Sequence, residues 1–109
     1  EVKLNKNGGN MTEILYTYEP DAARFVATTD EGQEVGTLVY AVEDRYWNAK
    51  HTWVNPDFRG HNIARNLLDM LVDTARAQGV LIFPTCSYVR HVMEKDASFA
   101  DVLFKPETE

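Results

Sequence analysis

The junction between a predicted strand and a predicted helix carries the residues best suited to bind an anion. It reads Val54-Asn55-Pro56-Asp57-Phe58-Arg59-Gly60-His61-Asn62-Ile63-Ala64. The first N–H groups of a helix have no partners within the helix, and the helix dipole adds partial positive charge there. Gly60 and Ala64 let phosphate oxygens approach the backbone, and Arg59 can add a charged side-chain contact. The pattern therefore predicts a phosphate-binding loop, and the alternative is an ordinary strand-to-helix turn.

Two further side chains could take part in covalent or proton-transfer chemistry. Cys86 is the single cysteine and stands at the predicted start of a helix, a position at which thiols are in general more reactive. The alternative for Cys86 is a small buried core residue. His51 is a candidate general base, because imidazole exchanges protons near neutral pH, and a structural histidine fits the sequence equally well. His91, on a second predicted helix, is expected at the surface.

The strands that carry these residues follow from the hydropathy pattern. Alternating or β-prone residues predict four strands before the loop, at residues 13–18, 23–29, 35–42 and 46–54. The turns at residues 30–33 and 44–45 are short, so the strands should form an antiparallel meander. Pro56 ends the fourth strand because proline cannot donate to a strand ladder.

A long helix, a short strand and a second helix should follow the loop. The long helix covers residues 62–78 and ends at Gly79, because apolar residues recur at about 3.6 positions and form one buried stripe: Ile63, Leu67, Leu68, Leu71, Val72 and Ala75. Residues 80–83 are wholly apolar and predict a strand inside the sheet. A second helix over 88–95 and a short helix or strand over 98–103 complete the chain. The predicted fold is α/β (α+β) with a mixed, mostly antiparallel sheet in the order β-β-β-β-α-β-α.

Length and composition limit the class of protein. The chain has 109 residues, of which 44% are hydrophobic and 26% charged, as expected for one globular domain. We expect residues 1–10 to be a disordered leader or an expression remnant, and residues 11–109 to form the domain. A net charge of −6 argues against nucleic-acid binding, which relies on Lys and Arg. One cysteine gives neither a disulfide framework nor a thiolate metal site.

The same features bear on location and assembly. No run reaches the roughly 18 apolar residues that cross a bilayer, and the N-terminus has no signal-peptide pattern. We therefore expect a cytoplasmic protein without membrane partners, present as a monomer or weak dimer.

The loop resembles motif A of the GNAT superfamily of acetyltransferases. That motif runs Arg or Gln, two residues, Gly, one residue, then Gly or Ala. Arg59 and Ala64 match its two ends, and Asn62 stands where the family normally has glycine. Asparagine is the non-glycine residue best suited to a left-handed conformation, although its side chain can crowd a pyrophosphate.

The resemblance is closest to the minimal YjdJ-type branch of that superfamily and covers residues 13–103. It rests on the pair His51-Thr52 before the loop, on Pro84-Thr85-Cys86-Ser87-Tyr88 after the next strand, and on the following Arg90-His91-Val92-Met93-Glu94-Lys95-Asp96. The joint order of these features is more specific than the loop alone.

The resemblance implies binding of acetyl-coenzyme A or coenzyme A and transfer of the acetyl group to an amine, either a peptide lysine or a small basic amine. It implies that Cys86 lies near the acetyl thioester, where an acetyl-cysteine intermediate is one route, with His51 or a water as base. The cofactor-binding residues it implies are Trp53, Val54, Arg59, Gly60, His61, Asn62, Ile63, Ala64 and Ser87. Trp53 also fits simple core packing.

We expect the chain to differ from larger GNAT enzymes on the side of the site where the acceptor amine would bind. Larger GNAT enzymes have one or two helices after their first strand, and no helical pattern precedes Asn62 here. We expect an open acceptor side, and coenzyme A in a gap between the fourth and fifth predicted strands. A coenzyme A-binding sensor or interaction module without catalysis is the main alternative, and a protein-interaction domain without a cofactor is the third.

Overall fold

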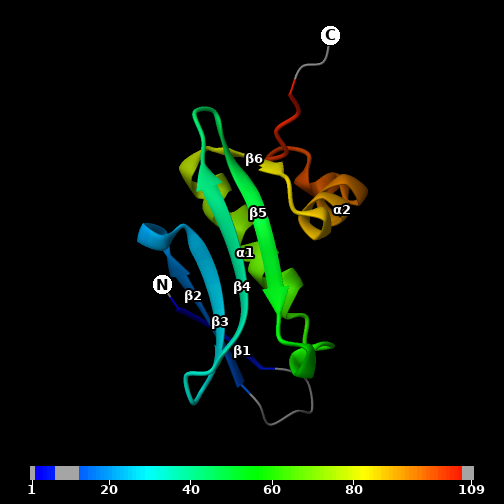
Figure 1. Cartoon of the computed structure of the whole chain (residues 1–109). Coiled ribbons are helices and arrows are strands. Elements are labelled where there is room, and N and C mark those ends of the chain that lie inside the picture. The colour runs from blue at the N-terminus through cyan, green and yellow to red at the C-terminus, as the bar shows by residue number, and fades with distance from the viewer. Residues whose placement is uncertain (1, 7–12, 107–109) are drawn as a thin grey trace.

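The computed structural model describes residues 2–6 and 13–106 (Figure 1). One six-stranded sheet runs in chain order, and two helices accompany it. Its elements are β1 (Val2–Lys6), β2 (Glu13–Glu19), β3 (Arg24–Thr29), β4 (Glu34–Val42), β5 (Tyr46–Val54), α1 (Ile63–Gln78), β6 (Leu81–Pro84) and α2 (Ser87–Lys95). Short 3-10 turns lie at Pro20–Ala22, Pro56–Phe58 and Ala97–Phe99. The predicted α/β class and the order of elements from β2 to α2 are confirmed.

The strand β1 was not predicted. Val2–Lys6 pairs antiparallel with β2, with Val2 opposite Thr17 and Lys6 opposite Glu13. Residues 2–6, part of the segment expected to be a disordered leader or an expression remnant, form this strand, and the rest of residues 1–10 lies outside the described residues. An edge strand leaves a row of N–H and C=O groups unpaired, so a polar segment can add to it through its backbone alone.

The last pairing of the sheet differs from the others. Strands β1 to β5 pair antiparallel, and β6 returns through α1 to pair parallel with β5. Pairing between β5 and β6 covers only Tyr46 to Ala49 of β5, opposite Leu81 to Pro84. The expected gap between these two strands is therefore present beyond Ala49.

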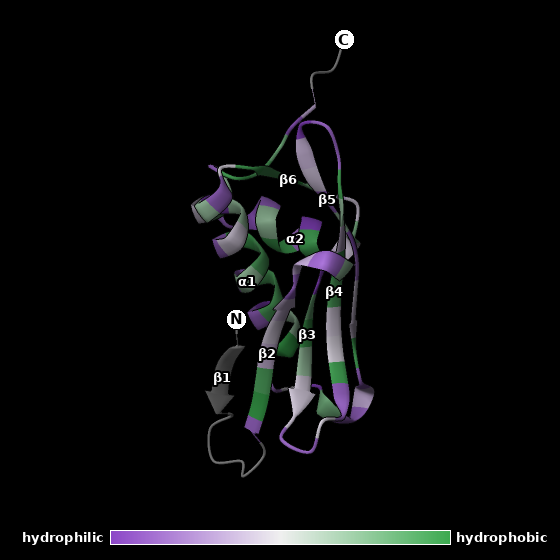
Figure 2. Cartoon of the chain, turned by 90° about the vertical axis from the view of Figure 1, so that its left-hand side faces the viewer, coloured by the Kyte–Doolittle hydropathy of each residue, from purple (hydrophilic) through white to green (hydrophobic). Residues whose placement is uncertain are grey.

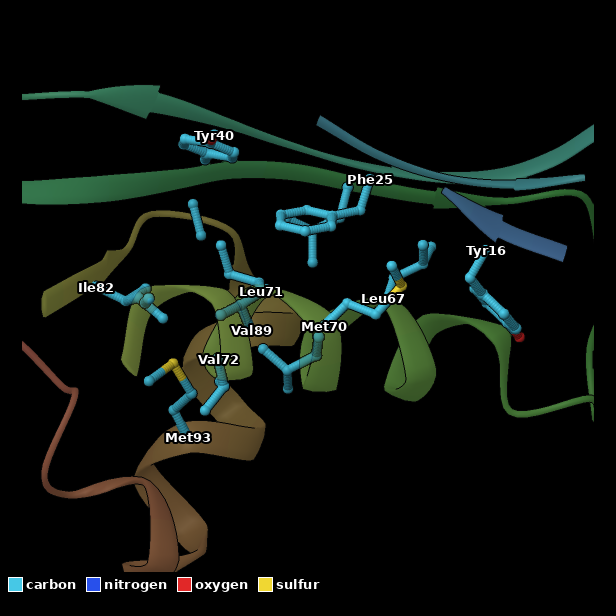
Figure 3. Close-up of a cluster of buried hydrophobic side chains, with 14 of the residues drawn as sticks. Tyr16, Phe25, Tyr40, Leu67, Met70, Leu71, Val72, Ile82, Val89 and Met93 are labelled. Carbon is cyan, nitrogen blue, oxygen red and sulfur yellow. The ribbon is translucent and has the colours of Figure 1, made fainter. Parts of the chain in front are cut away.

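Both helices lie on the same side of the sheet (Figure 2). The apolar face of α1 meets the inward-facing side chains of the strands, and Val89 and Met93 of α2 join this core from beside α1 (Figure 3). The periodicity that predicted α1 is confirmed by seven buried residues: Ile63, Leu67, Leu68, Met70, Leu71, Val72 and Ala75. Gly79 ends the helix in a left-handed conformation with φ 72°, as predicted.

The C-terminal segment adds to the far edge of β6. Leu103 forms a parallel bridge with Ile82, next to the 3-10 turn of Ala97–Phe99. Both alternatives predicted for residues 98–103, a short helix or a strand, are thus partly present.

Candidate functional site

The loop between β5 and α1 is shaped by two residues with positive φ. Gly60 has φ 88° and Asn62 has φ 60°, so Asn62 takes the left-handed conformation for which asparagine is suited. Upstream, the side chain of Asn55 accepts a 2.8 Å hydrogen bond from the N–H of Asp57 and fixes the Pro56–Phe58 turn. These constraints bring the chain to the start of α1 at Ile63.

The start of α1 has no side-chain cap. Asn62 is the N-cap residue, and its side chain makes no capping hydrogen bond. The first helical bond runs from the N–H of Asn66 to the carbonyl of Asn62. The backbone N–H groups of Ile63, Ala64 and Arg65 are therefore the ones that this end of the helix can offer to an anion.

A pocket of ≈ 310 Å³ opens at this end of the helix. Six of the residues predicted to bind the cofactor line it: Val54, Arg59, Gly60, Asn62, Ile63 and Ala64. Phe58, Arg65 and Tyr88 complete the lining. The pocket thus joins the end of β5, the loop, the first turn of α1 and the first turn of α2.

The gap in the sheet begins at a specific hydrogen-bond arrangement. The N–H groups of Thr85 and Cys86 both donate to the carbonyl of Ala49, at 3.0 Å and 2.9 Å, and turn the chain away from β5. Strand β5 continues to Val54 and pairs there only with β4 among the described residues. Its other edge is open from residue 50 onward.

A bulge in β5 decides which side chains face the helices. The register shifts between Val39 and Tyr40 of β4, and Lys50 is the extra residue of β5. Beyond it, Thr52 lies opposite Leu38, which is fully buried beneath the helices. His51 lies opposite Val39, on the sheet face without helices.

Cys86 and Thr52 meet across the gap. The Cys86 Sγ lies 3.5 Å from the Thr52 Oγ1, in hydrogen-bond contact, and both residues are half-buried. Cys86 is the N-cap residue of α2. The structure therefore brings the predicted cysteine to β5, and its neighbour there is Thr52.

The structure does not bring His51 or Trp53 into the pocket. Residues opposite each other in a sheet share a face, so His51 and Trp53 point to the side away from α1. Both are exposed, Trp53 to 39%. Their proposed roles in catalysis and pantetheine contact stay predictions, and a direct contact between His51 and Cys86 is absent.

The remaining predicted residues lie outside the lining of the pocket at the start of α1. His61 is half-buried with its ring 5.8 Å from that of Phe58, and its Nδ1 is buried without a partner among the described residues. Ser87 is exposed in the first turn of α2, and His91 is exposed as predicted. None of these lines the pocket.

Three pocket residues were missed by the sequence analysis: Phe58, Arg65 and Tyr88. The Arg65 Nε donates to the Asp69 carboxylate at 3.1 Å, and this bond is the main reason that the pKa of Arg65 is raised. The pKa of Tyr88 is raised chiefly by burial, so its phenol keeps its proton. The pattern Cys86-Ser87-Tyr88 at a helix start was the available signal for Tyr88.

Comparison with known proteins agrees with this geometry. The sequence profile of the GCN5-related N-acetyltransferase family matches residues 24–102, which is 79 of the 109 residues. The chain belongs to this family. Its matched region includes every element from β3 to α2, together with the loop and Cys86.

Solved structures give the family fold. A GCN5-like presumed N-acetyltransferase from Staphylococcus aureus is 27% identical, with a TM-score of 0.68 over 84% of this chain and 89% of its own. A ribosomal-protein-alanine N-acetyltransferase from Brucella melitensis biovar Abortus 2308 is 21% identical, with a TM-score of 0.54 over 79% of this chain. Nourseothricin acetyltransferase is 19% identical, with a TM-score of 0.53 over 86% of this chain.

The size of this family member differs from that of two of these structures. The chain spans 64% of the Brucella protein and 65% of nourseothricin acetyltransferase. Between β2 and β3 it has only the 3-10 turn of Pro20–Ala22. No curated protein sequence matches the chain.

Two further features are absent from the described residues, a metal-binding cluster and a membrane-spanning helix. Within residues 2–6 and 13–106, no group of three or more His, Cys, Asp or Glu residues could hold a metal ion. In the same ranges, no helix is both long and apolar enough to cross a membrane.

Proposed function

We propose that this chain binds acetyl-coenzyme A and transfers the acetyl group to an amine by direct attack. The observation that carries the proposal is the pocket at the uncapped start of α1, flanked by the end of a strand whose other edge is open. Membership of the GCN5-related N-acetyltransferase family supports it.

The pyrophosphate of coenzyme A fits the loop end of the pocket. The N–H groups of Ile63 and Ala64 would donate to its oxygens, with the helix dipole adding to the attraction. Arg59 and Arg65 both line the pocket, in a chain whose net charge is −6. Arg65 already pairs with Asp69, so Arg59, which forms no ion pair among the described residues, is the arginine left to contact a diphosphate.

The rest of the cofactor fits the open edge of β5. The arm of coenzyme A contains amides, and the unpaired backbone groups of residues 51–54 offer complementary donors and acceptors. Such pairing would use the backbone of Trp53, whose side chain points to the other face. Acetyl-coenzyme A, when bound, supplies an acetyl group activated as a thioester.

Residues of this chain would handle the protons. Tyr88 lines the pocket and holds its phenolic proton, because burial raises its pKa. It is suited to protonate a leaving thiolate. His51 lies on the opposite face of β5 and would accept a proton from an amine approaching there. The helix-free face is open to such an acceptor.

In this scheme Cys86 helps to hold the gap in its present form. Its Sγ is in contact with the Thr52 hydroxyl, and its N–H helps to turn the chain from β5 at Ala49. An acetyl-cysteine relay would need the thiol to leave Thr52. We therefore favour direct transfer over the relay.

The first test is the melting temperature with and without excess acetyl-coenzyme A. A ligand at roughly 100 times its Kd adds about 2.7 kcal/mol to the free energy of unfolding. For a domain of this size the melting temperature should rise by about 10 °C or more. Adenosine, which lacks phosphate and thioester, should give no comparable rise.

Two variants sharpen this test. Arg59→Ala removes a pocket arginine and should reduce the rise, whereas Arg45→Ala changes an exposed arginine that does not line the pocket and should leave it unchanged. No rise for the unmodified protein at millimolar ligand would contradict the proposal. A normal rise without release of free thiol in the presence of any amine would instead favour a coenzyme A-binding sensor.

A further inference from the structure

A second pocket lies on another face of α2. Its volume is ≈ 340 Å³, and it shares no residue with the pocket at the start of α1. Tyr88 of α2 lines the first pocket, and Arg90 and Glu94 of the same helix line the second. The acetyl-transfer scheme makes no use of this second pocket.

Aromatic stacking holds the floor of the second pocket in a fixed form. Phe83 at the end of β6 meets Phe104 edge to face, with ring centroids 6.4 Å apart. Tyr46 of β5 stacks on Phe104 at 4.5 Å and contacts Phe83 at 5.5 Å. These three rings support one another, so the apolar floor does not depend on a bound ligand.

Backbone hydrogen bonds fix the wall made by the C-terminal segment. The N–H of Ile82 donates to the carbonyl of Val102, and the N–H of Phe104 donates to the carbonyl of Ile82, both at 2.7 Å. This segment therefore extends the sheet beyond β6. The volume and mostly apolar lining of the pocket match those of preformed small-molecule sites.

The rim of the pocket carries more positive than negative charge. Among the lining residues within the described part of the chain, the basic residues are Arg90 and Lys105 and the single acidic residue is Glu94. The Arg90 Nε donates to the carbonyl of Pro84 at 3.3 Å, which orients the guanidinium and leaves its two terminal nitrogens to other acceptors. Among the described residues, neither Arg90 nor Lys105 forms an ion pair, although acidic residues outnumber basic ones by 17 to 11 in the chain.

We propose that this second pocket binds a small carboxylate with an apolar, aromatic-sized body. The apolar body would pack on Phe83 and Phe104, and the carboxylate would accept hydrogen bonds from Arg90, with Lys105 adding attraction. A planar guanidinium with two free nitrogens matches a carboxylate in a bidentate pair. Glu94 on the rim disfavours more highly charged anions, so a monovalent acid fits best.

A titration with 3-phenylpropionate tests the proposal, using amide chemical shifts of the full chain as the readout. We expect saturable shifts at the amides of Phe83, Arg90 and Phe104. The same titration with 2-phenylethylamine, which has the opposite charge on a similar body, should produce no saturable shift there. Equal binding of the amine, or no binding of the acid, would overturn the proposal.

Three variants on α2 identify the charges that matter. Arg90→Ala should weaken 3-phenylpropionate binding roughly tenfold, because a hydrogen bond to a charged group is lost. Glu94→Gln removes a repulsive charge and should tighten binding. Lys95→Ala, an exposed lysine of the same helix outside the pocket, should leave the affinity unchanged.

Other outcomes would also count against the site. The inference fails if Arg90→Ala and Lys95→Ala bind alike, or if Glu94→Gln weakens binding. It also fails if the shifts occur in the loop of residues 59–65 and not around Phe83. Because Glu94 is exposed, its replacement tests the charge argument even if Arg90→Ala does not fold.

Discussion

Tyr88 and Cys86, both at the start of α2, have different surroundings. This difference distinguishes direct acetyl transfer from a covalent relay through the cysteine. The Tyr88 phenol lines the pocket at the start of α1 and has a raised pKa, as a proton donor requires. The Cys86 thiol is already in contact with the Thr52 hydroxyl, 3.5 Å away. Direct transfer depends on the tyrosine, whereas a covalent relay depends on the cysteine.

The pair of variants Tyr88→Phe and Cys86→Ala tests this at the scale of single residues. We expect Tyr88→Phe to lower the turnover number about a hundredfold, because general acid catalysis is lost without loss of ring packing. Cys86→Ala should leave turnover close to that of the unmodified protein. Release of free thiol from acetyl-coenzyme A, measured with an amine acceptor, gives both rates.

The opposite result would establish the relay. If Cys86→Ala abolishes turnover while the melting temperature still rises with acetyl-coenzyme A, the cysteine carries the acetyl group. Binding by both variants must be confirmed first, since a loss of binding would lower the rate for another reason.

At the scale of elements, the contact between β4 and α1 sets the position of the loop. Gly36 of β4 lies beneath the first turn of α1, where an added Cβ would meet the Ile63 Cγ2 at 2.7 Å. The same Cβ would lie 3.4 Å from the Leu67 Cδ1 and from the backbone oxygen of Trp53. Glycine at this position lets the start of α1 pack directly on the sheet.

We expect Gly36→Ala to lower the free energy of unfolding by about 1–3 kcal/mol, the usual cost of overpacking. It should also reduce the temperature rise caused by acetyl-coenzyme A, because Ile63 would move and its N–H belongs to the proposed phosphate site. Urea denaturation measures the first effect.

The control for this substitution lies on the same strand. Val42 is 67% exposed, so Val42→Ala should change the free energy of unfolding by less than about 0.5 kcal/mol. Equal effects of the two substitutions would mean that the contact between Gly36 and Ile63 does not limit the packing of α1.

At the scale of the whole molecule, buried phenols link stability to pH. The Tyr40 hydroxyl lies 2.7 Å from that of Tyr18, joining β4 to β2 across β3. Burial is the largest cause of a strongly raised pKa of Tyr40, and burial also raises the pKa of Tyr88. Both phenols stay protonated in the folded chain at a pH where the unfolded chain ionises them.

The sign of the pH dependence follows. A raised pKa in the folded state gives full stability below the unfolded value of about 10, and stability falls as the pH rises above it. We expect the free energy of unfolding to decline above about pH 10. Tyr40→Phe, which cannot ionise, should show a smaller decline, as measured by urea denaturation at pH 7 to 11.

Tyr40→Phe and the unmodified protein are compared by how steeply their free energies of unfolding fall with pH. This comparison separates the effect of Tyr40 from general charge repulsion. The net charge of −6 becomes more negative at high pH in both proteins, so repulsion is common to them. Identical slopes for Tyr40→Phe and the unmodified protein would exclude a role for Tyr40.

Local patterns in the sequence determined most elements and the loop. The 3.6-residue periodicity predicted α1 and Gly79 predicted its end, because a helical repeat and a glycine cap are both local patterns that can be read from the sequence. The left-handed conformation of Asn62 followed likewise, since few residues other than glycine tolerate it. Strand β1 was missed because its pairing with β2 needs only backbone groups, which leave no hydropathy pattern in the sequence.

The tertiary structure alone decided which side chains share the site. Regular alternation from the buried Ala49 would turn His51 toward the helices, and the bulge at Lys50 gives that side to Thr52 instead. A bulge depends on pairing with β4, which the sequence of β5 does not encode by itself. Tyr88 reaches the pocket only because α2 packs beside α1, an arrangement set by contacts between residues far apart in the chain.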